Sequence, residues 1–332
     1  MSRPLPDPVY VFHGLGSGVS AVRFILFEEE LFLVVGTIDG QLLLLDWKSK
    51  RLLAAVSVEK NCKNPVSVQS CGYCNDFVWC FRRTRGLFMH RIADRNLVLQ
   101  PSFVLSSAHY GFCGADCFHL SNNPSSFMLA IPNYSSSSVS TVEIYKWPKL
   151  NAPCQTVLLC SEPSPGLPLC LKLISESLLL VAFENGQISC FDVSSGAMLS
   201  CLKLHSESLM SFDLHLSSRI GLAGFAGGGG LKRWTVDDNG ALIALSDSKS
   251  SHAVMDTGIS CVRIRHDAKI AVCAFWDKKV RVYSFKSDKL LAVIDRGASC
   301  IDFLVEEGFP LSVFALGSIE DAAISIYDLY SK

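Results

Sequence analysis

The chain has 332 residues with a formal net charge of −1, and 49% of its residues are apolar. It has enough apolar side chains for a large core, and it lacks the positive excess of a nucleic-acid-binding or acidic-membrane surface. The longest apolar run, residues 31–47, contains Asp39 and Gly40, so it falls short of the roughly 18 apolar residues of a membrane helix. We therefore expect neither nucleic acid nor a membrane as a direct partner.

The first ten residues, MSRPLPDPVY, contain no apolar segment of the kind found in signal peptides. We therefore expect the chain in the nucleus and cytoplasm, with its 14 cysteines reduced. Four of them lie singly in apolar strand-like runs, which is typical of buried free thiols: Cys190, Cys261, Cys273 and Cys300. One C-x-x-C pair occurs, but its only candidate partners lack the spacing of a common zinc site: Cys71 and Cys74, with Cys113 and Cys117. We predict neither a metal site nor a cofactor.

Taken in chain order, the predicted strands fall into seven similar units. Each unit begins with an alternating strand, continues with an apolar strand and a tight turn, and ends with a third and a fourth strand; in the first unit these are residues 19–24, 31–36, 41–45 and 51–58. The units are predicted at residues 19–58, 65–100, 109–160, 167–204, 208–246, 258–294 and 297–330. Four short strands in a unit of about 40 to 45 residues are typical of a β-propeller blade.

The units align on a large residue near the end of the third strand, which we expect to fill the space between blades. These column residues are Leu45, His90, Tyr145, Phe191, Trp234, Tyr283 and Tyr327. The longest interval, between the second and third column residues, contains NYSSSSVS (133–140), which we interpret as an exposed loop insertion. Its serines Ser135–Ser138 are phosphorylatable in principle.

The last unit has no fourth strand after its column residue, and residues 8–14, PVYVFHG, offer one instead. We predict that this segment completes the seventh blade and closes the ring, which removes open sheet edges. No segment shows a sustained 3.6-residue period, so helices should be few. The sequence thus predicts a single all-β domain, a seven-bladed propeller.

Six residues before four of the column residues stands an acid or an amide: Asp39, Asn185, Asp277 and Asp321. Such residues stabilise tight turns, so we interpret them as structural turn residues rather than catalytic carboxylates. We expect the neighbouring Trp276 to pack between blades.

No catalytic motif accompanies these turns. The glycines of FAGGGGLKRW lack the Lys-Ser or Lys-Thr of a phosphate-binding loop, and HGLGSG (13–18) is followed by a strand-like rather than a helical segment. No nucleophile–base spacing is present among the histidines. We predict a protein that is not an enzyme.

These residues resemble the WD40-repeat family, and the resemblance covers nearly the whole chain. In that family a turn Asp joins a Ser or Thr and a His in a hydrogen-bonded network. Thr37 with Asp39 resembles part of it, and His205 matches the His that precedes the first strand. Two positions depart from the pattern, with Gly228 in place of an Asp and Phe275 in place of a Ser, so the network is expected to be incomplete.

A closer resemblance is carried by PLPDPVYVFHG at the start, by residues 259–294 and by the ending ISIYDLYSK. Together they resemble the guanine nucleotide-binding protein subunit beta-like proteins, also called ASTRA-associated proteins. That resemblance implies an interaction scaffold of the chromatin-remodelling-linked ASTRA complex. It also implies a partner of the TTT co-chaperone in the maturation and stability of phosphatidylinositol 3-kinase-related kinases.

The sequence also bears on two binding roles other than the scaffold. A G-protein β subunit needs a long N-terminal helix for its γ subunit, and Pro4, Pro6 and Pro8 oppose one, so we expect no γ subunit. A peptide reader or ubiquitin-ligase substrate receptor stays open as the alternative, although LDWK, FDVS and YDLY all lack the Arg of the W-D-x-R motif common in such receptors.

Overall fold

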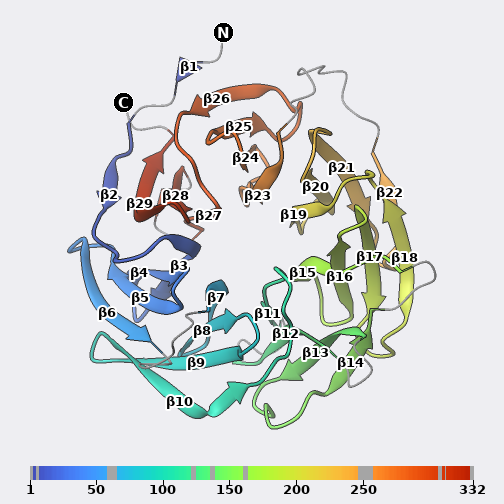
Figure 1. The fold of residues 1–332 in the computed structure, drawn as a ribbon, viewed down its shortest axis with the longest axis horizontal. Coiled ribbons are helices and arrows are strands. Elements are labelled where there is room, and N and C mark those ends of the chain that lie inside the picture. The colour runs from blue at the N-terminus through green and yellow to red at the C-terminus, as the bar shows by residue number, and fades with distance from the viewer. Residues whose placement is uncertain are drawn as a thin grey trace.

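The computed structural model describes residues 3–4, 7–57, 66–120, 125–134, 139–159, 164–245, 257–305, 309–310 and 312–329. Throughout these ranges the regular structure is β, and the strands form seven sheets arranged radially around a central axis (Figure 1). The predicted seven-bladed propeller is confirmed. No helix in the described part of the chain is long and apolar enough to cross a membrane.

Each blade is an antiparallel meander. Blade 1 contains β3 (Val19–Phe27), β4 (Glu30–Thr37), β5 (Gln41–Asp46) and β6 (Arg51–Ser57). Blade 2 contains β7 (Val68–Cys74), β8 (Phe77–Arg82), β9 (Gly86–Ala93) and β10 (Asn96–Leu105). Blade 3 contains β11 (Asp116–His119), β12 (Phe127–Tyr134), β13 (Ser140–Lys146) and β14 (Gln155–Leu158). Blade 4 contains β15 (Pro168–Leu173), β16 (Leu178–Phe183), β17 (Gln187–Asp192) and β18 (Met198–Lys203).

The remaining blades follow the same order. Blade 5 contains β19 (Leu209–His215), β20 (Ile220–Phe225), β21 (Leu231–Val236) and β22 (Leu242–Ala244). Blade 6 contains β23 (Ile259–Ile264), β24 (Ile270–Phe275), β25 (Val280–Ser284) and β26 (Leu290–Ile294). Blade 7 contains β27 (Cys300–Phe303), β28 (Val313–Ser318) and β29 (Asp321–Asp328), with β2 (Tyr10–Phe12) as its outer strand.

The N-terminal strand closes the ring as predicted. β2 runs antiparallel to β29, with Tyr10 opposite Ile326 and Phe12 opposite Ile324. A second contact was not predicted: the two-residue strand β1 (Arg3–Pro4) pairs in parallel with β26 and gives blade 6 a fifth strand. A two-residue strand leaves no periodic pattern that a sequence could reveal.

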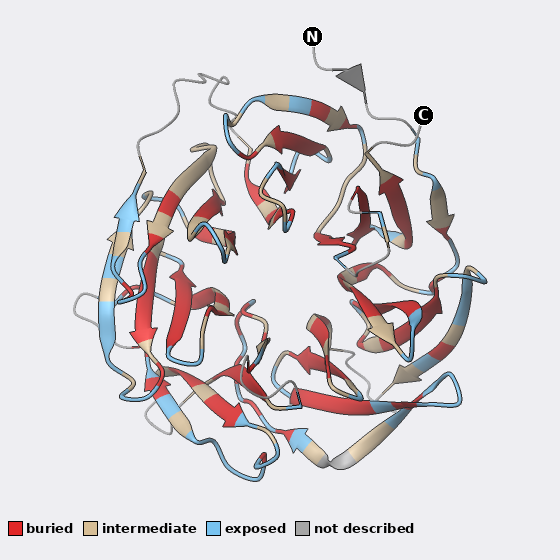
Figure 2. Ribbon diagram, turned by 180° about the vertical axis from the view of Figure 1, so that it is seen from behind, coloured by how far each residue is buried: buried red, intermediate tan, exposed pale blue. Residues whose placement is uncertain are grey.

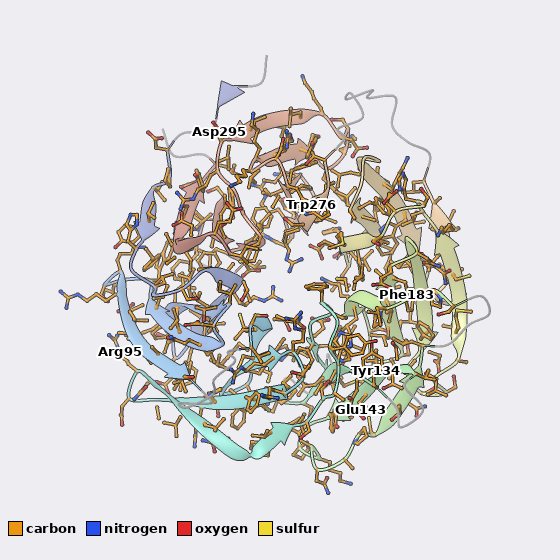
Figure 3. The ribbon with its side chains drawn as sticks, viewed as in Figure 1. Arg95, Tyr134, Glu143, Phe183, Trp276 and Asp295 are labelled. Carbon is orange, nitrogen blue, oxygen red and sulfur yellow. The ribbon has the colours of Figure 1, made fainter. Side chains whose placement is uncertain are left out.

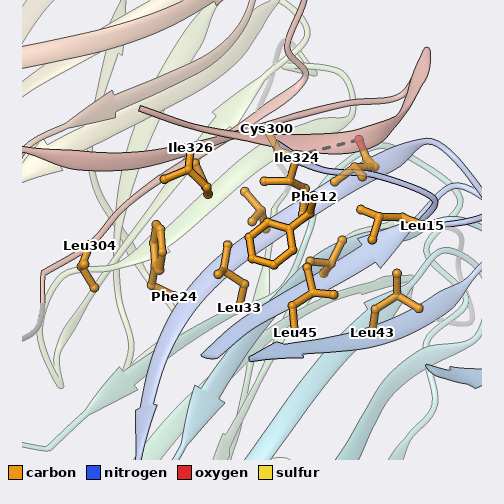
Figure 4. Packing of buried hydrophobic residues seen from close by; sticks show 14 of the residues in the cluster. Phe12, Leu15, Phe24, Leu33, Leu43, Leu45, Cys300, Leu304, Ile324 and Ile326 are labelled. Carbon is orange, nitrogen blue, oxygen red and sulfur yellow. Dashed lines mark hydrogen bonds between the residues drawn. The ribbon is translucent and has the colours of Figure 1, made fainter. Parts of the chain in front are cut away.

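The blades are held together by apolar clusters, and each cluster joins two neighbouring blades. The second strand of a blade is covered on both sides, so β16, β24 and β28 are buried at every position, whereas outer strands such as β18 are largely exposed (Figure 2). At the closing seam Phe12 packs with Leu33 and Leu45 of blade 1 and with Ile324 of blade 7 (Figure 4).

The structure corrects one expectation about a segment. Residues 133–140 are not wholly a loop, because β12 continues through Tyr134, which pairs with Ser140 at the start of β13. The insertion therefore lengthens a hairpin, and Ser135–Ser138 lie outside the described residues.

The C-x-x-C pair is split between two interfaces. Cys71 lies in the cluster between blades 1 and 2, and Cys74 in the cluster between blades 2 and 3. Residues three apart on an extended strand point to opposite sides, so the pair cannot form one half of a metal site. Within the described ranges, no three His, Cys, Asp or Glu side chains are grouped as metal ligands.

Candidate interaction site

The turn residues named from the sequence lie in separate blades. In blade 1 the Thr37 hydroxyl donates to the Asp39 carboxylate, and Thr37 Oγ1 accepts the backbone N–H of Gln41 at 2.9 Å. In blade 4 Asn185 Oδ1 accepts the backbone N–H of Gln187 at 2.9 Å. Each interaction closes a local turn between the second and third strands, and none reaches another blade.

In blade 6 Asp277 accepts the backbone N–H of Lys279 at 3.2 Å and a guanidinium N–H of the buried Arg281 at 3.0 Å. These hydrogen bonds from Arg281 hold the pKa of Asp277 below its usual value. The carboxylate therefore clamps its turn and compensates a buried cation.

The remaining two residues have other surroundings. Asp321 is the first residue of β29, is about half exposed, and forms an ion pair of 2.7 Å with Arg296. His205 Nδ1 accepts the backbone N–H of Glu207 at 3.1 Å, and its ring lies 5.0 Å from that of Phe225. No carboxylate joins this histidine in the contacts of the described chain.

All seven column residues are buried. Six of them lie in the apolar cluster shared with the preceding blade: Leu45, Tyr145, Phe191, Trp234, Tyr283 and Tyr327. His90 is also fully buried, and neither of its ring nitrogens has a hydrogen-bond partner in the structure. Burial, with a smaller contribution from the nearby Arg82, lowers the pKa of His90 to about 4, so the ring is neutral at pH 7.

In four blades the residue directly after the second strand donates its backbone N–H to the residue just before the first strand of the same blade; these residues are Ile38, Glu184, Ala226 and Trp276. The backbone N–H of Ile38 donates to Gly18 O, and that of Trp276 donates to Gly258 O, both at 2.9 Å. These bonds hold the turn after the second strand against the entry to the first strand of the same blade. We call the side of the ring that carries these turns the turn face.

Three successive blades place a large apolar residue at this position. Trp276 of blade 6 is 53% exposed, Ile319 of blade 7 is 51% exposed and Ile38 of blade 1 is 42% exposed. We call these three residues the apolar arc. Large exposed apolar side chains on one side of the ring are candidates for an interaction surface.

The exposure of Trp276 corrects the expectation that it packs between blades. Gly258 is the cause, because a Cβ atom at that residue would lie 2.6 Å from the indole ring. The missing side chain lets the indole lie over the backbone on the turn face, and in Figure 3 it projects toward the middle of the ring.

An aromatic and basic segment continues the turn face at blades 2 and 3. Phe112 is 68% exposed, and the guanidinium carbon of Arg83 lies 5.6 Å from the centre of its ring. Tyr110 stacks on Tyr134 with the ring centres 4.7 Å apart. Arg83 belongs to the basic turn RRTR, and its contact with an exposed aromatic ring could not be read from the local sequence.

Apolar, aromatic and arginine side chains are the types enriched at the centres of protein–protein interfaces. The turn face presents these types together, and its polar residues are engaged in turns and ion pairs rather than in a nucleophile–base arrangement. The face is therefore suited to binding a protein surface or segment. A sequence signal for the arc exists, because each of its members directly precedes an acidic residue: Asp39, Asp277 and Glu320.

No family model matches the chain. Nearly the whole chain aligns with guanine nucleotide-binding protein subunit beta-like protein 1 of Mus musculus, with 27% identity over 338 residues that cover 98% of this chain and 97% of the relative. The chain resembles that protein. A shorter match, 40% identical over 74 residues, links it to ASTRA-associated protein 1 of Schizosaccharomyces japonicus and covers 22% of this chain and 20% of the relative.

Solved structures with 12% and 14% identity share the fold of this chain. The β-propeller domain of Cps50 (Swd1) from Myceliophteria thermophila superposes with a TM-score of 0.72, over 96% of this chain and 99% of that one. Raptor of Chaetomium thermophilum gives a TM-score of 0.74 over all of this chain but 29% of its own length. These likenesses establish the seven-bladed propeller architecture independently of the sequence match.

Proposed function

We propose that this propeller is a non-enzymatic scaffold that binds proteins through its turn face. Its proposed partners are the TTT co-chaperone, the kinases related to phosphatidylinositol 3-kinase, and subunits of the ASTRA complex. In this role it assists the maturation and stability of those kinases, in the nucleus and the cytoplasm.

The apolar arc is the observation that carries the binding role. Trp276, Ile319 and Ile38 expose apolar surface from three successive blades that the ring holds in fixed positions. A rigid, preformed apolar surface binds at a low entropic cost, because its side chains need little ordering. The choice of partners is supported by the full-length similarity to the beta-like protein and by the shorter match to an ASTRA-associated protein.

Affinity purification of the tagged full-length chain from its own cells, followed by quantitative mass spectrometry, tests the choice of partners. We expect TTT subunits and the related kinases to be enriched above an untagged control. Enrichment of a cullin adaptor without TTT subunits would favour a substrate receptor of a ubiquitin ligase and overturn the proposal. Recovery of a γ subunit of the G-protein type would overturn it in favour of signalling.

A further inference from the structure

The first strands of all seven blades line a central channel that encloses a cavity of about 290 Å³. At one level of this channel, every blade contributes the residue at the same register position of its first strand. In blade order this channel ring consists of Arg23, Gly72, Asp116, Lys172, Asp213, Arg263 and Asp302.

The charges of the channel ring alternate in sign from blade to blade. Strict alternation cannot close in a ring with an odd number of members, because two like charges would become neighbours. Gly72 of blade 2 resolves this conflict by contributing no charge between Arg23 and Asp116. Like charges side by side in a channel of low polarity would be destabilising, so the neutral position has a physical reason.

Two ion pairs satisfy four of the six charges. Arg23 Nη1 lies 2.9 Å from Asp302 Oδ1, and Lys172 Nζ lies 2.7 Å from Asp213 Oδ1. Asp302 also accepts the backbone N–H of Phe24 in the next blade at 2.8 Å, which ties the blades together around the channel.

The other two charges, Asp116 and Arg263, have no ion-pair partner within the described residues. Asp116 Oδ2 accepts the backbone N–H of Leu173 at 2.9 Å, and Arg263 donates to the carbonyl oxygen of Val262 at 3.0 Å. They come from blades 3 and 6, three blades apart in a ring of seven, so they face the channel from opposite walls. Burial raises the pKa of Asp116, and the nearby Lys172 and Arg23 offset part of this shift.

A neutral donor lies beside Asp116 at the uncharged position of the ring. Trp79 lines the cavity although it is only 2% exposed, and its Nε1–H has no hydrogen-bond partner among the described residues. A Cβ atom at Gly72 would lie 2.4 Å from the indole ring and 2.9 Å from its nitrogen. The edge of the indole that carries the N–H therefore fills the space that a side chain at position 72 would occupy.

We propose that the central channel binds a small zwitterion of the amino-acid class, with its ammonium group on Asp116 and its carboxylate on Arg263. A carboxylate and a guanidinium are the side chains best suited to these two groups, because the hydrogen bonds they form are charge-assisted. Trp79 Nε1–H supplies a further donor for a ligand oxygen. The cavity volume is at the small end of the range for ligand pockets, which fits a ligand of this size. The two charged residues of the site come from first strands inside the channel, although the exposed Phe112 also lines the cavity, and the inference does not depend on the proposed partners.

The wild-type protein tests this inference without any substitution. Isothermal titration with glycine, β-alanine, γ-aminobutyrate, δ-aminovalerate and ε-aminocaproate varies the distance between the two charges. We expect binding to peak at one chain length. The amine and the carboxylic acid of that length, which each lack one charge, should bind at least tenfold more weakly. If no member of the series binds, or if the singly charged compounds bind equally well, the inference is wrong.

Substitutions in the channel provide the second test. Asp116→Asn keeps the shape of its side chain and Arg263→Gln shortens a polar one, and both remove the charge; each should weaken binding of the best zwitterion by about 10- to 100-fold, the usual loss for a charged hydrogen bond. Glu184→Gln on the turn face is the matched control and should leave binding unchanged. Circular dichroism establishes that each variant is folded. Unchanged affinity in both folded channel variants would contradict the proposed site.

Discussion

Closure of the ring by three residues can be tested at Phe12. Its side chain is 3% exposed and packs in the cluster between blades 7 and 1, and its ring meets that of Tyr10 edge-on with the centres 4.8 Å apart. Replacing a buried Phe with Ala costs about 3–5 kcal/mol, and an aromatic pair of this geometry contributes about 0.5–1.5 kcal/mol beyond its burial. We therefore expect Phe12→Ala to lower the free energy of unfolding by about 4 kcal/mol.

Urea unfolding followed by tryptophan fluorescence measures this loss. With a denaturant slope of roughly 3 kcal/mol per molar, the midpoint should fall by roughly 1 M. Val9→Ala is the control, because Val9 lies just before the same strand but is 50% exposed, and its change should stay within about 0.5 kcal/mol. A loss below about 1 kcal/mol for Phe12→Ala, or a separate early transition that leaves the remaining signal unaffected, would refute the view that this seam stabilises the whole ring.

Two further predictions concern ionisable side chains that are buried or that pair with a buried partner. Burial lowers the pKa of His90 and of His109 to about 4, so each gains a proton on unfolding below pH 6.5. Their contribution to the free energy of unfolding is present above pH 6.5 and is lost as the pH falls toward 4, by about 2 kcal/mol each at pH 5. Urea titrations of wild type and His90→Phe at pH 7 and pH 5 should show a smaller loss of unfolding free energy in the variant. Equal losses in the two proteins would contradict the assignment. Asp277→Ala leaves the buried Arg281 unpaired and should cost about 3 kcal/mol in thermal or urea unfolding, whereas Asp321→Ala removes an exposed ion pair and should cost less than about 1 kcal/mol. Similar losses in these two variants would show that Asp277 is not a clamp.

The architecture could be predicted because the sequence consists of seven similar units, one for each blade. Six of the seven column residues lie in the cluster shared with the preceding blade, and the regular spacing from Leu45 to Tyr327 predicted the number of blades. The final unit lacked an outer strand, and PVYVFHG supplied one. Both features depend on local alternation and on counting, which a single sequence contains.

The site could not be predicted in the same way, because its residues are distant in sequence. The exposure of Trp276 depends on Gly258, which belongs to the start of the blade's first strand. The ring of charges depends on a shared register among seven first strands, and the sequence does not show which charges pair. In the sequence, Asp116 and Arg263 cannot be distinguished from the other charged residues of those strands. Only the structure shows that, among the described residues, the other four form ion pairs and these two do not.

Binding of purified TTT co-chaperone to the purified chain tests the central claim most directly. The decisive comparison is between wild type, the double variant Trp276→Ala with Ile319→Ser, and Ile243→Ser, a rim control whose residue is 56% exposed on the outer strand of blade 5. We predict saturable binding that weakens at least 30-fold in the double variant, since loss of one interface hot spot costs about 2 kcal/mol or more, and that is unchanged in the control. No binding by the wild-type chain, or equal binding by all three proteins, would contradict a scaffold that binds TTT through its turn face.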